Sequence, residues 1–264
     1  MPRPIRKPMA APFALVSLSL LATLAGCALT SPTPSTPPAP IAAGDGLAPF
    51  SANPPGALPR GWHPQAITRA KKPTEYRLVD DGGVSVLHAH AAASASALMR
   101  DLDLDPAERP WLRWRWKAAR PIHAADNRYR DSEDSPVRIV LAFDGDKGSL
   151  PFTEQILFET GRLVAGRELP YATLVYIWEN RAPVGSVIAH TRTGQVKMVV
   201  AASGGAGIGQ WRSLSRNIVD DYRRAFGQAP GRLIGIGVMS DTDNTGETAD
   251  AWYGDIELHR APPD

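Results

Sequence analysis

The sequence predicts an all-β domain: a two-sheet β-sandwich of jelly-roll type with one packed helix near residues 217–227. Apolar residues alternate with polar or small ones over many short segments, as they do in strands that bury one face. The 25 prolines and 23 glycines favour many short elements joined by turns over long helices. Seven tryptophans supply bulky side chains that can fill the space between two sheets.

The clearest strand is expected at residues 111–117 (WLRWRWK). Leu112, Trp114 and Trp116 would face the interior, and the basic residues between them would lay their aliphatic stems across the outer face. A Gly-Gly turn at 82–83 indicates a hairpin between two other strands. Further strands are expected at residues 76–81, 84–90, 94–100, 137–143, 152–160, 171–178, 186–193, 195–203, 234–239 and 252–258.

One segment, residues 217–227 (NIVDDYRRAFG), has a helical pattern. Ile218, Tyr222 and Phe226 recur at helical spacing and form an apolar stripe. Two aspartates early in the segment and two arginines late in it match the helix macrodipole. Gly227 fits the left-handed position that follows a helix. We therefore expect one helix packed against a sheet.

The first 26 residues are predicted to be a secretory signal. Arg3, Arg6 and Lys7 precede an apolar run that is too short to span a membrane. The run ends in LAGC at 24–27, which resembles the lipobox of bacterial lipoproteins. The resemblance implies cleavage before Cys27 and acylation of this residue, the only cysteine of the chain. Because no aspartate follows it directly, the resemblance also implies an anchor in the outer membrane, facing the periplasm.

After the predicted signal, the sequence divides into a tether and one domain. Residues 27–47 combine the acylated cysteine with a stretch rich in Pro, Ser, Thr and Ala, which is typical of a semi-extended tether. Residues 48–260 contain no internal repeat and no second linker, and their number suits one β-sandwich domain. With its only thiol acylated, the mature chain would have no internal disulfide and no cysteine nucleophile or metal ligand.

The net charge limits the kinds of binding partner that the sequence predicts. Without the three basic residues of the signal, 26 Lys and Arg face 27 Asp and Glu, a net charge of −1. Nothing in such a balance predicts binding to nucleic acid. The expected partners are the lipid bilayer, reached through acylated Cys27, and either a glycan or an envelope protein.

An acidic loop (DTDNTGE, 241–247) separates two predicted strands near the C-terminus. Asp241, Asp243 and Thr245 offer oxygen ligands at alternate positions before a glycine, as in the first half of a calcium loop. Position twelve of that pattern is Trp252 instead of a bidentate glutamate. A structural Ca²⁺ at these three residues is therefore one interpretation, and a metal-free loop held by Asx-turns is the other.

The most polar loop (AADNRYRDSEDS, 124–135) leads into the strand expected at 137–143. Glu133 and Asp134 are candidates for a general acid/base pair, since two carboxyl groups flanking one bond are what glycoside hydrolysis requires. A solvated loop without catalytic function is the alternative. The sequence alone does not indicate whether this loop meets the acidic loop at 241–247.

Five segments together resemble the bacterial family of unknown function called DUF3047. They are WLRWRWK (111–117), SPVRIVLAF (135–143), LPYATLVYIW (169–178), RNIVDDYRRAFG (216–227) and SDTDNTGETADAWYGDIEL (240–258). The resemblance covers most of residues 48–260 and implies no particular activity. The closing AWYGDIEL also resembles the last strand of jelly-roll carbohydrate-binding modules, which often hold a structural Ca²⁺ near that strand.

The leading functional hypothesis is a non-catalytic module that binds a glycan or another envelope polymer. A fold does not determine a function, so the hypothesis depends on individual residues. Sugars need aromatic faces for contacts with CH groups, and oxygen or amide groups for their hydroxyls. The candidate ligand-binding residues are Tyr129, Trp178, Asn244, Tyr253 and Asp255.

Two alternatives remain. A scaffold lipoprotein without a small ligand would expose a large apolar patch instead of a polar groove. A polysaccharide hydrolase would need two carboxylates, but the chain has neither a Gly-x-Ser-x-Gly nucleophile motif nor a His-Glu-x-x-His zinc motif. The balance is therefore against an enzyme without excluding one. The candidate carboxylates are Asp126, Asp131, Glu133, Asp134, Asp241 and Asp243.

Overall fold

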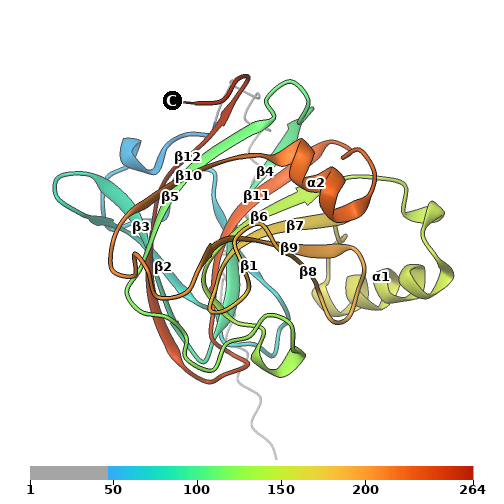
Figure 1. Cartoon of the computed structure of the whole chain (residues 1–264), viewed down its shortest axis with the longest axis horizontal. Coiled ribbons are helices and arrows are strands. Elements are labelled where there is room, and N and C mark those ends of the chain that lie inside the picture. Colours follow the sequence, from blue (N-terminus) through green and yellow to red (C-terminus); the bar gives the residue numbers. More distant parts are fainter. Residues whose placement is uncertain (1–46, 264) are drawn as a thin grey trace, which may run out of the picture. The chain divides into compact units, whose positions relative to one another are not determined.

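The structure, a computed structural model, describes residues 47–263 as two β-sheets packed against each other (Figure 1). The larger sheet has seven strands: His63–Ala66 (β1), Ala95–Leu104 (β4), Ser135–Phe143 (β6), Ala172–Glu179 (β7), Val187–Ala189 (β8), Val196–Ser203 (β9) and Leu233–Asp241 (β11). Their order is β1-β4-β11-β6-β7-β9-β8. Neighbouring strands are antiparallel except for β7 and β9, which are parallel.

The smaller sheet has five strands in the order β10-β5-β12-β3-β2, all antiparallel to their neighbours. They are Glu75–Asp80 (β2), Ser85–Ala92 (β3), Trp111–Ala118 (β5), Arg212–Asn217 (β10) and Thr248–His259 (β12). The described helical turns of the 3-10 type are Phe50–Ala52 (η1), Arg130–Ser132 (η2) and Lys147–Ser149 (η3).

The main apolar core lies between the two sheets. On β5, Leu112, Trp114 and Trp116 are buried and the residues between them are not, so the alternation predicted for this strand is confirmed. Trp114 stacks on Tyr176 of β7 with ring centroids 5.0 Å apart, a contact that joins the two sheets. Each such ring removes a large apolar area from water, which stabilises the fold by about 1.5–3 kcal/mol.

The predicted all-β sandwich is confirmed, with some differences in its elements. The predicted segment at 186–193 is a strand only over the three residues of β8, and β1 and β10 were not predicted. Glycines in β11 mark a close approach of the neighbouring strand. A Cβ on Gly237 would overlap Met99 and would come within 3.1 Å of the Leu98 carbonyl oxygen on the neighbouring β4.

The predicted helix is confirmed as Ile218–Phe226 (α2). Asn217 caps it, because its side-chain oxygen accepts hydrogen bonds from the backbone N–H groups of Val219 and Asp220, each at 3.1 Å. Gly227 follows it in the left-handed conformation with φ 74°. The buried Asp221 of this helix accepts a hydrogen bond of 2.8 Å from the hydroxyl of Tyr176, which joins the helix to β7.

The prediction of a single helix was wrong. Residues 152–160, expected to be a strand, belong to a second helix, Phe152–Ala165 (α1), at the right-hand edge of Figure 1. Phe152, Ile156 and Leu163 follow helical spacing, but they are exposed by 75%, 51% and 75%. The apolar stripe is not buried, so the segment lacks the pattern of a helix that faces a core. The short apolar run Ile-Leu-Phe favours a strand instead.

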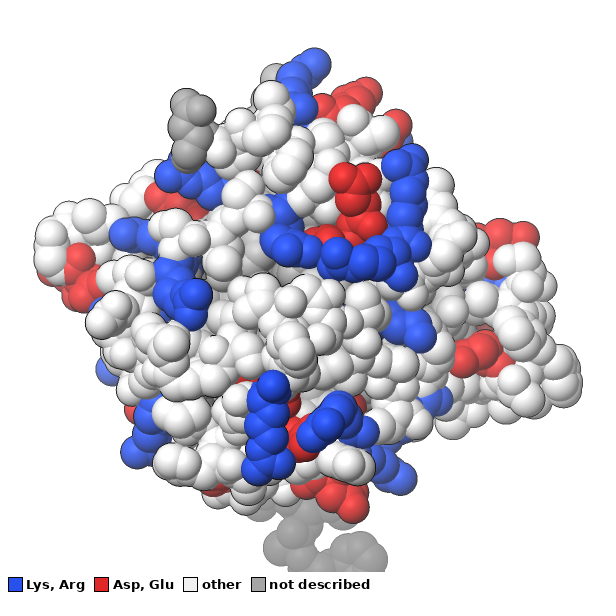
Figure 2. Space-filling view, in the orientation of Figure 1, with Lys and Arg blue, Asp and Glu red and all other residues white. Residues whose placement is uncertain are grey.

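The predicted signal, the lipidation site Cys27 and most of the tether lie outside the described residues. Within residues 47–263, neither α-helix has the length and apolar composition needed to cross a bilayer. On the face shown in Figure 2, basic and acidic side chains are interspersed. This mixture agrees with the formal net charge of the sequence, which is only +2.

Candidate functional site

A cleft of about 640 Å³ lies on the outer face of the seven-stranded sheet. Successive residues of a strand point to opposite faces, so Ile139 and Leu141 of β6 enter the core, whereas Arg138, Val140 and Ala142 line the cleft. The neighbouring strands β4, β7 and β11 contribute in the same way. Residues outside these strands that line the cleft include Gln65, Thr68, Lys71, Leu157, Phe158 and Thr193.

Four residues of the cleft, Glu133, Arg138, His190 and Asp241, form what we call the charged cluster. Arg138 connects its members: its Nε donates to Asp241 Oδ1 at 2.8 Å, and its Nη2 donates to the Glu133 carbonyl oxygen at 3.0 Å. His190 Nε2 lies 3.6 Å from Glu133 Oε1. Two carboxyl groups, a guanidinium and an imidazole therefore meet in one part of the cleft.

Burial shifts the pKa values of the acids and of the imidazole in the charged cluster. The pKa of Asp241 is raised to about 6, because burial outweighs the ion pair with Arg138 and because Asp134 adds repulsion. Burial also raises the pKa of Glu133, although nearby cations oppose the shift. For His190, burial and the same cations lower the pKa to about 4, so this imidazole is neutral at pH 7.

The arginine of the charged cluster keeps its charge. Burial alone would lower the pKa of Arg138, but Asp241 and Glu133 raise it above its ordinary value. The carboxyl group is therefore the partner of the Arg138–Asp241 pair that titrates in the accessible pH range. Shifted pKa values in a cleft indicate a functional site, although buried ion pairs produce them too.

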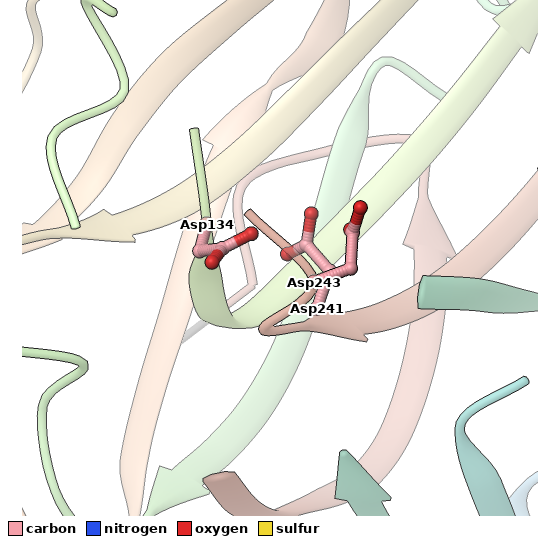
Figure 3. A group of neighbouring side chains, drawn as sticks. All are labelled: Asp134, Asp241 and Asp243. Carbon is pink, nitrogen blue, oxygen red and sulfur yellow. The ribbon is translucent and has the colours of Figure 1, made fainter. Parts of the chain in front are cut away.

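Three carboxylates beside the charged cluster lie close enough to share a cation. One oxygen each of Asp134, Asp241 and Asp243 lies within 4.8 Å of the others (Figure 3). Two cations already balance part of this charge, since Lys71 Nζ lies 2.5 Å from Asp243 Oδ2 and Arg138 pairs with Asp241. One Asp243 oxygen, Oδ1, is buried without a hydrogen-bond partner among the described residues.

The predicted calcium site differs from this group in one member. Asp241 and Asp243 belong to it, but its third carboxylate comes from Asp134 and not from the 241–247 loop. The backbone N–H of Thr245 donates to Asp134 Oδ2 at 2.7 Å, and its Oγ1 accepts from the N–H of Glu247 at 3.4 Å. Asp134 and Thr245 therefore form hydrogen bonds that stabilise the loops, as polar side chains do in a loop without a metal.

The two acidic loops meet in space, which the sequence did not indicate. Asn244 donates from its backbone N–H to Asp134 Oδ1 at 3.3 Å, and from its amide to the Glu133 carbonyl oxygen at 3.1 Å. The Glu247 carboxylate accepts the backbone N–H groups of His123 and Ala124 at 3.1 and 2.9 Å. The loop at 124–135 and the loop at 241–247 therefore form one continuous wall at this end of the sheet.

Most of the predicted ligand-binding residues lie elsewhere. Only Asn244 lines the cleft. Trp178 and Tyr253 are buried in the core, with exposures of 3% and 0%, so they present no aromatic face to a ligand and this part of the prediction is corrected. Tyr129 is exposed outside the cleft beside Arg128, and Asp255 accepts hydrogen bonds from Ser51, so neither is part of the cleft.

The remaining hydrolase candidates are also separated from the charged cluster. Asp126 is buried and forms an ion pair with Arg128, whose Nη2 lies 2.6 Å from Asp126 Oδ2. Asp131 is exposed on η2 and does not line the cleft. Of the predicted carboxylates, Glu133 and Asp241 are the two that line it. Asp134, a predicted acid/base candidate, instead accepts backbone N–H groups of the facing loop.

Several residues of the site could not be identified from the sequence. Lys71, Arg138, His190 and Arg192 line the cleft, but each stands in a segment without a recognisable motif. The position of Arg138 between two apolar residues of a strand was the only available hint, because a charged residue there must either face solvent or be paired.

His88 and His90 share the outer face of the five-stranded sheet, on the strand β3. His88 Nε2 and His90 Nδ1 lie 3.1 and 2.8 Å from the same oxygen of Asp250, Oδ1. The side chain of His88 also contacts Trp252, with ring centroids 5.1 Å apart. Both histidines are therefore held by a carboxylate of the neighbouring strand β12.

The fold and the cleft define a β-sandwich protein with an open, ligand-sized cleft on its larger sheet. The chain belongs to DUF3047, a family described as proteins of unknown function, whose family profile matches residues 60–257. No curated protein sequence matches this chain.

Among solved structures, the chain is similar to endoglucanase 3 of family GH12 from Trichoderma harzianum, at 7% identity, with 79% of this chain and 94% of that chain covered and a TM-score of 0.38. It is also similar to a thermostable cellulase derived from Cel12A of Rhodothermus marinus (10% identity, 78% and 100% coverage, TM-score 0.38). A third similar structure is the cellulose induced protein Cip1 (10% identity, 76% and 91% coverage, TM-score 0.31). At identities and TM-scores this low, the similarities do not indicate a ligand or a reaction.

Proposed function

We propose that this protein binds a glycan or another envelope polymer in the cleft of the seven-stranded sheet, without catalysis. The observation that carries the proposal is the open cleft of about 640 Å³, whose rim offers amide, hydroxyl and charged side chains. Gln65, Thr193 and Asn244 are examples. Such groups donate and accept hydrogen bonds as sugar hydroxyls require, and the volume is that of an ordinary ligand site.

Binding of solubilised peptidoglycan fragments, measured by calorimetry, tests the proposal. Thr173 lines the cleft, so Thr173→Trp should place a bulky ring in it and weaken saturable binding at least about tenfold. Val184 is 58% exposed and does not line the cleft, so Val184→Trp is the matched control and should bind as the wild type does. If neither peptidoglycan nor other envelope polysaccharides bind the wild type, the proposal is wrong.

A second candidate function, polysaccharide hydrolysis, is supported by one observation. Glu133 and Asp241 are the two predicted carboxylates that line the cleft, and burial raises the pKa of each. A carboxylic acid with a raised pKa is suited to protonate a leaving group. In this reading, Glu133 is the proton donor, because Asp241 is held by Arg138 and by the backbone N–H of Ser135 at 3.0 Å.

Release of reducing ends from the same polysaccharides distinguishes the two functions. A hydrolase should generate them with the wild type and lose at least about a hundredfold of that rate in Glu133→Gln, which keeps the side-chain shape but cannot donate the acid proton. Binding without any reducing ends favours the non-catalytic function. Activity that Glu133→Gln leaves unchanged would contradict the role given to this residue.

The location of the protein is also a proposal. The lipobox-like LAGC motif at 24–27 supports acylation of Cys27 and an outer-membrane anchor facing the periplasm. Cells fed with labelled palmitate should label the wild-type chain and not Cys27→Ala. Membrane fractionation should then find the variant in the soluble fraction. A labelled Cys27→Ala chain would place the anchor elsewhere.

A further inference from the structure

Beyond the charged cluster, the strands that form the floor of the cleft present mainly aliphatic side chains, whereas the rim is polar. Met99 of β4, Val140 and Ala142 of β6, Val175 of β7 and Met239 of β11 line it from neighbouring strands. Among the described residues that line the cleft, Phe158 is the only Phe, Tyr or Trp. The floor therefore offers flexible and branched aliphatic side chains instead of a flat aromatic surface.

This composition discriminates between kinds of ligand. A sugar ring presents CH groups to an aromatic face, which this floor lacks. An alkyl chain has no such requirement, and each CH₂ that leaves water contributes about 0.8 kcal/mol wherever it packs. Methionines adapt well to such chains, because their side chains are unbranched and polarisable. The floor is thus better suited to an alkyl chain than to a sugar.

The helix α1 borders the cleft and carries exposed apolar side chains. Leu157 lines the cleft and is itself 38% exposed, and Phe152, Ile156 and Leu163 of the same helix are more exposed still. The carboxylate of Glu154 ties this helix to the rim, since it accepts from Thr193 Oγ1 at 2.8 Å. Exposed apolar surface on α1 therefore borders the cleft at Leu157.

The rim carries two arginines whose charge is available to a ligand. Arg130 and Arg192 line the cleft, are exposed, and have no carboxylate oxygen within 4.0 Å among the described residues, although Arg192 lies near enough to Glu133 to oppose the rise in its pKa. Lys71 and Arg138, by contrast, are already paired with Asp243 and Asp241. Two exposed guanidinium groups beside a cleft suit an anionic group such as a phosphate or a carboxylate.

We propose that the ligand of this cleft is an anionic amphiphile: an alkyl chain lies on the aliphatic floor, and an anionic headgroup lies on the rim beside Arg130 and Arg192. The inference rests on the proposed function, because it assigns the ligand of the same cleft, and it specifies a lipid-linked glycan or a comparable envelope amphiphile. The headgroup supplies the polar contacts of the rim, and the chain supplies the apolar ones of the floor.

Three probes test the proposal by calorimetry, each below its micelle concentration. Dodecyl phosphate has the chain and an anionic head, dodecyl maltoside has the same chain and a neutral sugar head, and peptidoglycan fragments have no alkyl chain. The protein is the mature chain, residues 27–264, with Cys27→Ser so that no acyl group of its own competes. Dodecyl phosphate should bind saturably and about tenfold more tightly than dodecyl maltoside, a difference of about 1.4 kcal/mol.

Variants separate the floor from the rim. Val140→Asn places a polar group on the floor and should weaken dodecyl phosphate about tenfold, whereas Val184→Asn, the same change at an exposed position outside the cleft, should not. The double variant Arg130→Ala/Arg192→Ala changes only exposed side chains and should remove the preference for the anionic head. A thermal melt of each variant shows that it is folded.

The outcomes separate this inference from the proposed function. Binding of peptidoglycan fragments without binding of either dodecyl compound would overturn the inference and leave the glycan function standing. Failure of all three probes, and of other envelope polysaccharides, to bind would overturn both. Dodecyl phosphate binding that Val140→Asn leaves unchanged would place the chain elsewhere and would also overturn the inference.

Discussion

At the scale of single residues, the pair of Arg138 and Asp241 dominates the candidate site. Both side chains are buried, with exposures of 5% and 6%, and a 2.8 Å hydrogen bond joins them. Two charges withdrawn from water cost free energy that their attraction must offset, and the raised pKa of Asp241 shows that burial outweighs the pairing.

The pKa of Asp241 predicts how stability depends on pH. A carboxyl group raised from about 3.9 in the unfolded chain to about 6 in the folded one binds its proton more tightly when folded. Its contribution is therefore complete below about pH 4 and is lost as the pH rises through about 6, a change on the order of 2–3 kcal/mol. The lowered pKa of His190 changes stability in the opposite direction over the same range, but it does so in both proteins. The difference in unfolding free energy between the wild type and Asp241→Asn, measured by urea denaturation between pH 4 and 7, should therefore fall by this amount as the pH rises.

The control for this pH dependence is Asp131→Asn, which removes an exposed carboxylate from the neighbouring loop. It should leave the pH profile of the wild type unchanged. A profile that is the same in wild type and Asp241→Asn would show that burial of this carboxyl group does not control its protonation.

The three neighbouring carboxylates lead to a prediction about Ca²⁺. Lys71 and Arg138 already pair with Asp243 and Asp241, and the backbone of Asn244 and Thr245 donates to Asp134. An ion would have to displace these partners, so we expect thermal melts in Ca²⁺ and in EDTA to coincide. The opposite result, a rise of several degrees that Asp243→Ala abolishes, would establish a cation site, since saturation at 100 times Kd adds about 2.7 kcal/mol.

At the scale of elements, local rules decided which predictions succeeded. The strand β5 was predictable because it alternates bulky apolar and basic residues, and α2 because its cap, its charges and Gly227 agree with each other. The helix α1 lacks that agreement: Pro151 precedes it without a capping side chain, and most of its apolar residues are exposed. Periodicity identifies a helix most reliably where the apolar stripe is buried.

The cap of α2 gives a prediction at this scale. Asn217→Ala removes the side-chain oxygen that accepts from Val219 and Asp220, so it should cost about 1 kcal/mol of unfolding free energy in urea denaturation. Asn217→Ser retains a capping oxygen and should cost little. If alanine and serine prove equally destabilising, the loss does not come from the cap.

The candidate site was less predictable than the elements, because it depends on pairing between distant strands. Glu133, Asp134 and the loop at 241–247 were identified from their composition, but their meeting follows from the register that places Asp241 opposite Ser135 in the β6–β11 pair. A shift of one residue would turn Arg138 into the core and Ile139 into the cleft. No local pattern in the sequence specifies that register, so the cleft and its cations were not predictable.

At the scale of the whole molecule, the two sheets are expected to unfold together. Their facing surfaces share one core, and Trp114 stacks on Tyr176 across it, so neither sheet can keep its apolar face buried when the other separates. The lone cysteine, Cys27, allows no disulfide within the chain, so packing alone must provide this cooperativity. Residues 47–264 should therefore melt in one transition.

Far-UV circular dichroism and tryptophan fluorescence should give the same midpoint, with or without a reductant. The calorimetric enthalpy should equal the van't Hoff enthalpy, at about 150 kcal/mol near 60 °C for a domain of this size. Fluorescence reports mainly on the core between the sheets, where Trp114, Trp116 and Trp178 are buried. A fluorescence midpoint well below that of circular dichroism would mean that the sheets separate before they melt, and that the sandwich is not one cooperative unit.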